Sequence, residues 1–122
     1  MSYEEMEKEA LALRLKSEKI MKKAQTMKFT IDEIVFSVSE ITGVSVKQLK
    51  SKSRKREYVV PRQFAMYKIK KAFNSMTWKS ISGIFNRHHT TAIYAFHEVE
   101  SKLSVNDEYI KFLFDSYKNL HN

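Results

Sequence analysis

The chain has 122 residues, 43% of them hydrophobic, which is enough for one domain with its own core and an appended helix. Two glycines and one proline nearly exclude hairpins and glycine-rich phosphate loops, and the absence of cysteine excludes disulfides and thiolate zinc sites. No run is long and apolar enough to span a membrane, and the acidic start over residues 1–5 is not a secretory signal, so we expect a cytoplasmic protein.

Residues 2–27 are predicted to form one long helix. Large apolar residues recur every seven positions, at Met6, Leu13, Ile20 and Met27, and small residues follow four positions after the first three. Small residues at these positions make a weak coiled coil. We therefore favour packing of this helix on the body of the protein or on a partner, while self-association through residues 1–28 stays open.

Two capping motifs mark the next helices. Thr30 with Glu33 predicts a capping box at the start of one helix, and Gly43 can end it. Ser45 with Gln48 repeats the motif for a short second helix.

Four further helices are predicted by apolar residues at helical spacing, and no strand-like alternation is present. The fold class is therefore all-α with six or seven helices, divided into an N-terminal helix over 1–28 and a domain over 29–122. The predicted markers are Pro61 in the first turn of a helix that runs to about Asn74, Thr77 or Ser75 before a helix that ends near Phe85, an apolar pattern from Ala92 to Leu103, and a last helix from about Asn106.

The formal net charge of +8 is concentrated in one block of the chain. Residues 47–71 carry ten basic side chains against Glu57 alone. A solvated charged face is the alternative, but a cluster of this kind favours a polyanionic partner, most often nucleic acid.

The segment Asn86 to Ala92 places a cation, two imidazoles and two hydroxyls at the start of a predicted helix that follows another short helix. Helix-turn-helix proteins bring such polar side chains into the major groove at the N-terminus of their second helix. The first-turn N–H groups and the helix dipole favour phosphate oxygens at the same place.

Three segments resemble the C-terminal DNA-binding domain of DnaA, the bacterial replication initiator. They are the basic loop Ser51 to Arg56, the helix start Pro61 to Tyr67, and Phe85 to Thr91, which is similar to the family signature F-G-G-R-D-H-T-T. The resemblance covers residues 29–121. It implies a Trp-repressor-like helix-turn-helix domain that binds duplex DNA at replication origins, without a cofactor or metal.

The resemblance also implies a role for each matching position. Arg54 would enter the minor groove, while His88, His89 and Thr90 would read bases in the major groove. The remaining implied contacts, to phosphates or to the groove edge, are Lys52, Lys55, Arg56, Arg62, Gln63, Lys70, Trp78, Lys79, Arg87, Thr91 and Tyr94.

Three departures from the family pattern matter. His88 replaces an aspartate, which predicts an altered base preference, because a carboxylate only accepts hydrogen bonds. Asn86 replaces a Gly-Gly turn, and asparagine tolerates the left-handed conformation that such a turn requires. The sequence holds no G-x-x-x-x-G-K-[ST] motif, so we expect no ATP-driven initiator activity.

Other functions are less favoured by the residues. A metal site is unexpected, because His88 and His89 should point in different directions on a helix and no carboxylate completes a set with His97. No catalytic signature accompanies the histidines, so we expect no enzyme. A transcriptional regulator, or a module that recruits a replication protein without reading DNA, remains as the alternative.

Overall fold

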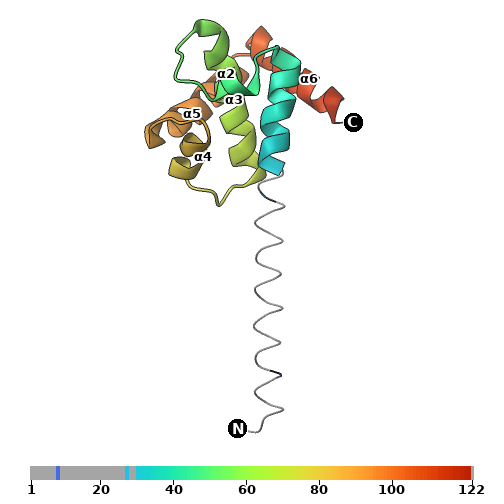
Figure 1. Cartoon of the computed structure of the whole chain (residues 1–122). Coiled ribbons are helices and arrows are strands. Elements are labelled where there is room, and N and C mark those ends of the chain that lie inside the picture. The colour runs from blue at the N-terminus through green and yellow to red at the C-terminus, as the bar shows by residue number, and fades with distance from the viewer. Residues whose placement is uncertain (1–7, 9–26, 28–29, 122) are drawn as a thin grey trace. The chain divides into compact units, whose positions relative to one another are not determined.

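The computed structural model describes residues 8, 27 and 30–121, and the chain divides into two compact units, residues 1–32 and 33–122. The helix predicted over residues 2–27, with its heptad pattern, lies outside the described residues except for positions 8 and 27. Residues 30–121 contain helices joined by loops and turns, with no strand, which confirms the predicted all-α class (Figure 1).

Local capping chemistry sets the first boundaries of the domain. A helix over residues 30–42 ends at Gly43, whose φ of +75° and N–H bond to the Ser39 carbonyl, at 2.9 Å, are those of a helix terminus. Helix α2 (Val46–Leu49) begins with the predicted capping box between Ser45 and Gln48. The predicted cap at Thr30 is wrong, because Thr30 is itself helical.

Helix α3 (Arg56–Ala72) runs through the centre of the domain and begins earlier than predicted. Pro61 lies inside it rather than in its first turn. The Tyr58 N–H donates to the Lys55 carbonyl at 2.9 Å, so a turn forms ahead of the proline. Pro61 removes one backbone bond, the one that an N–H at this position would make to Glu57, and the helix continues past it.

Helices α4 (Trp78–Ile84) and α5 (His89–Ser104) form the helix-turn-helix, and α6 (Glu108–Leu120) closes the domain. The Thr77 side chain caps α4 by accepting from the Ser80 N–H, as predicted. Asp107 caps α6, after Asn106 has ended α5 in a left-handed conformation with φ of +56°. The last helix therefore starts two residues after the predicted position.

The core forms where α3 and α4 pack against α5 (Figure 1). Phe64 and Ile69 of α3, Phe85 after α4, and Val99 of α5 have no solvent exposure. Helix α6 adds Phe114, whose ring lies edge-on to Phe64 with centroids 5.0 Å apart. This packing fixes the turn between α4 and α5, which carries the candidate interface.

Candidate nucleic-acid interface

The turn between α4 and α5 is built around Asn86. Its φ of +56° confirms the predicted left-handed turn. The Asn86 N–H donates to the Gly83 carbonyl at 3.1 Å and the Arg87 N–H to the Ser82 carbonyl at 3.0 Å. These two bonds form a Schellman motif, so α4 ends at a defined residue and α5 leaves it in a defined direction.

Ser82 ties the end of α4 to the start of α5, a role that the sequence analysis missed. Its side chain is fully buried. Its hydroxyl accepts from the Ala92 N–H and donates to the His89 carbonyl, both at 3.1 Å. The sequence did contain a signal for this role. The helical spacing of Ile81 and Phe85 predicts an apolar residue at position 82, and a serine stands there instead.

His88 is the N-cap of α5. Its backbone is extended, and its Nδ1 accepts from the Thr90 N–H at 3.4 Å and lies 2.9 Å from Thr90 Oγ1. The prediction that the His88 and His89 rings point in different directions is wrong, because His88 precedes the helix. The two centroids lie 4.1 Å apart. Both rings are exposed, and so is Thr90.

Three N–H groups near the start of α5, those of Thr90, Thr91 and Ala92, already have partners inside the protein. Thr90 donates to His88 Nδ1, Thr91 donates to the His88 carbonyl at 2.9 Å, and Ala92 donates to Ser82. Contrary to the expectation from sequence, these groups are not open to phosphate.

The basic loop between α2 and α3 has a defined conformation. Ser51 Oγ donates to the Gln48 carbonyl at 2.7 Å, and the Ser53 and Lys55 N–H groups donate to the hydroxyls of Ser51 and Ser53 at 3.3 and 3.2 Å. The loop cations are exposed to solvent, namely Lys52, Arg54, Lys55 and, at the start of α3, Arg56.

Arg62 of α3 is bonded to the backbone of this loop and of the end of α2. It is 5% exposed, and its Nε donates to the Leu49 carbonyl at 2.7 Å. Its Nη2 lies within 3.2 Å of the carbonyls of Gln48, Ser51 and Ser53. Burial and the neighbouring Arg87 cation lower the pKa of Arg62, although a guanidinium stays protonated at neutral pH. This geometry does not support the direct phosphate contact that we expected of Arg62.

Lys70 and Trp78 are also engaged inside the domain. Lys70 Nζ donates to the carbonyls of Asn74 and Met76, both at 2.8 Å, and lies 4.4 Å from the centroid of the Trp78 ring. The Trp78 ring packs edge-on against Phe96 with centroids 5.5 Å apart. Lys70 therefore bonds to the turn between α3 and α4, whereas Lys79 beside Trp78 is exposed.

A small cavity brings together six of the residues predicted for DNA binding. It has a volume of about 180 Å³. Two of its lining residues, Arg87 and Gln63, each have a buried side-chain atom, Nε and Oε1, without a hydrogen-bond partner among the described residues. Tyr94 at its rim is 62% exposed. The lining residues are Arg54, Val59, Arg62, Gln63, Met66, Arg87, Thr91 and Tyr94.

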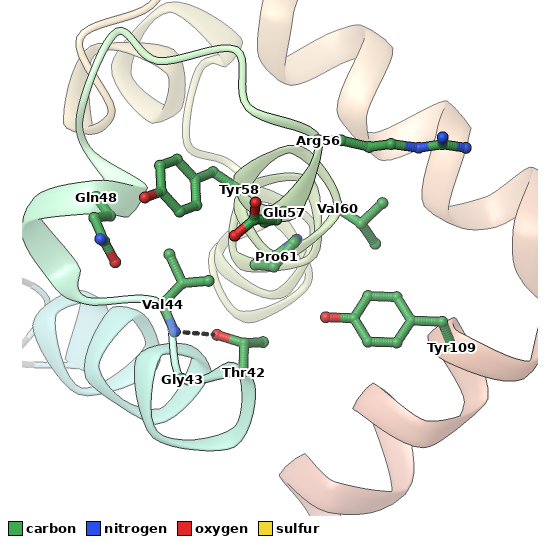
Figure 2. Close-up of a pocket in the computed structure, with 10 residues that line it drawn as sticks. All are labelled: Thr42, Gly43, Val44, Gln48, Arg56, Glu57, Tyr58, Val60, Pro61 and Tyr109. Carbon is green, nitrogen blue, oxygen red and sulfur yellow. Dashed lines mark hydrogen bonds between the residues drawn. The ribbon is translucent and has the colours of Figure 1, made fainter.

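A larger cavity of about 590 Å³ lies elsewhere in the domain, between the end of the helix over 30–42 and the starts of α3 and α6. Figure 2 shows Tyr58 and Tyr109 on opposite sides of it, with Pro61 and Glu57 between them. Of the residues predicted for DNA binding, it contains only Arg56. The candidate interface is thus an outer surface with a small notch rather than this cavity.

Within residues 30–121, no three histidine or carboxylate side chains are grouped as a metal site requires. None of the helices in that range has the length and apolarity of a membrane span. The side chains at the start of α5 and in the basic loop are cations, imidazoles and hydroxyls.

Comparison with known proteins finds relatives that match most of this chain. The chromosomal replication initiator protein DnaA 1 of Chlamydia pneumoniae is 32% identical over 103 residues, which cover 84% of this chain and 22% of that protein. DnaA 2 of Chlamydia caviae is 29% identical over 109 residues, covering 83% and 24%. DnaA of Onion yellows phytoplasma is 31% identical over 92 residues, covering 75% and 17%.

The chain thus spans no more than about a quarter of the length of these relatives. A family model described as the bacterial DnaA protein helix-turn-helix matches residues 31–99, more than half of the chain and all of the segment that holds the loop, the turn and the start of α5. The chain therefore belongs to the family of bacterial DnaA helix-turn-helix domains.

Proposed function

We propose that this chain binds duplex DNA in a sequence-specific manner and acts in replication initiation or its regulation. One observation carries the proposal: the exposed polar start of α5 lies beside a cationic loop that is far from it in sequence. The Arg87 guanidinium joins them, because its Nη2 donates to the carbonyls of Ser51 at 2.7 Å and Ser53 at 3.0 Å. The names of the DnaA relatives support the assignment to replication.

The two parts of this surface would contribute different terms to binding. Exposed cations of the loop and of α4 would neutralise phosphates and give salt-dependent affinity with little dependence on sequence. Arg54 would lie in the minor groove, where it senses groove width and A·T content.

The cap of α5 suggests how His88 would read a base. Since Nδ1 accepts from the Thr90 N–H, the neutral ring carries its proton on Nε2, which then acts as a donor. Guanine N7 and O6 are acceptors in the major groove, whereas cytosine N4 is a donor. His88 would therefore favour a base edge that the family's aspartate disfavours.

Substitution of the reading residues tests this division. His89→Ala or Thr90→Ala should weaken binding to the preferred site by about 1–3 kcal/mol and leave binding to random duplex nearly unchanged. Fluorescence anisotropy with both duplexes measures the two affinities.

Lys52→Ala is the matched control, since it removes one exposed loop cation. It should weaken binding to both duplexes alike and reduce the salt slope by about one. Equal losses on both duplexes for His89→Ala and Thr90→Ala would contradict the assignment of base reading to α5.

A further inference from the structure

Three side chains from outside the basic loop donate to backbone carbonyls within residues 48–53. Arg62 Nη2 and Arg87 Nη2 share the carbonyls of Ser51 and Ser53, at distances from 2.7 to 3.2 Å. Asn86 Nδ2 donates to the Lys50 carbonyl at 3.2 Å. Two guanidinium groups and one amide thus hold the same short stretch of backbone.

Two of these donors belong to the turn that sets the direction of α5. Asn86 and Arg87 stand directly before its N-cap, and they are 34 to 36 residues away from their loop partners. The third donor, Arg62, is buried in α3. Loop, turn and α3 are therefore joined by hydrogen bonds in addition to apolar packing.

Placing these two guanidinium groups together, one of them buried, costs free energy. Neutralising phosphates from the surface would not require that cost. The guanidinium groups lie close together, and burial followed by the Arg87 cation lowers the pKa of Arg62. Bonds to several carbonyls offset this cost, and the planar fork of arginine makes them in a way that lysine cannot. The geometry of both side chains serves the loop backbone.

We propose that Arg62, Asn86 and Arg87 are positioning residues, a clamp that locks the basic loop to the start of α5. Arg54 follows the clamped carbonyls by one residue and is exposed. If the proposed function holds, the clamp couples the minor-groove contact of Arg54 energetically to the major-groove contacts of α5. A clamped loop has less conformational freedom to lose on binding than a free one.

The clamp itself is tested without DNA. Because the chain has no cysteine, Lys52→Cys provides a unique site for a nitroxide spin label on the exposed loop. Asn86→Gly removes one clamp bond, keeps every charge and leaves a residue that adopts a φ of +56° readily. Asn106→Gly is the matched control, with the same change at the same φ in a turn that has no bond to the loop.

Electron paramagnetic resonance of the labelled full chain measures the mobility of the label. The mobility should be at least twofold higher in Asn86→Gly than in Asn106→Gly or in the labelled chain without either change. Arg62→Lys should mobilise the label further, since it keeps the charge but loses the fork. If Arg62→Lys fails to fold, Asn86→Gly still decides the result. Equal mobility in Asn86→Gly and Asn106→Gly would overturn the clamp.

A double-mutant cycle tests the coupling. Arg54→Ala should lower affinity for the preferred duplex at least tenfold in the parent and in Asn106→Gly, but by a smaller factor in Asn86→Gly, where one of the clamp bonds is missing. Equal losses in all three backgrounds would overturn the coupling while leaving DNA binding intact. Absence of binding by the parent chain would instead overturn the proposed function, and the spin label would still report on the clamp.

Discussion

His88 is the N-cap of α5, and the proposed function gives the same side chain a base-reading role. Its Nδ1 accepts from the Thr90 N–H, and a neutral ring that accepts there would carry its proton on Nε2 as a donor. A carboxylate at the same position would also cap the helix, and its negative charge would suit the dipole better. The two residues thus differ little as caps and greatly as partners for a base.

The substitution His88→Asp should therefore change sequence preference without unfolding the domain. We expect the preferred base at one position to shift from an acceptor edge toward cytosine, with a change of about 1–3 kcal/mol at that position. Sequencing of duplexes selected by the parent and the variant measures the shift. The exposed His97, farther along α5, provides the control His97→Asp, which should leave the motif as it is. An identical motif for the parent and His88→Asp would refute the reading role.

At the scale of elements, local signals predicted what local chemistry determines. The capping box at Ser45, the cap at Thr77, the helix end at Gly43 and the left-handed turn at Asn86 each depend on residues within a few positions, and all were found. The start of α3 was predicted too late, with Pro61 in its first turn. A helical turn forms ahead of Pro61, although the proline has no N–H to donate back to that turn.

The candidate site was less predictable, because its organisation depends on distant segments. The family pattern placed Arg62 and Lys70 near DNA, but their partners are carbonyls of the protein itself. Nothing in the spacing of Arg87 and Ser51 indicates that they meet, since 36 residues separate them. Only the folded domain shows that Arg62 and Arg87 bond to the loop backbone.

Ser82 provides a test of the link between α4 and α5. Ser82→Ala should lower the free energy of unfolding by about 1–3 kcal/mol, because the Ala92 N–H is left buried without its acceptor. Thermal or urea unfolding followed by circular dichroism measures the loss. Ser101→Ala, on the exposed surface of α5, should change stability by less than about 0.5 kcal/mol. A loss no larger than that control would show that Ser82 does not hold the two helices together.

At the scale of the whole molecule, the basic side chains include two groups, those that lie over aromatic rings and those that face solvent in the loop. Within the basic block, Lys68, Lys70 and Lys71 lie over aromatic rings of α3, α4, α5 and α6. The loop cations face solvent beside the start of α5. Arg62 and Lys70 are bonded to carbonyls inside the domain, so the salt dependence of binding should reflect the exposed cations instead.

Selection from a pool of random duplexes, with sequencing at a low and a high salt concentration, tests the central claim most directly. We expect the same enriched motif at both concentrations, with weaker binding overall at the higher salt. Salt-sensitive binding without a motif, or no binding at either concentration, would contradict sequence-specific reading by α5.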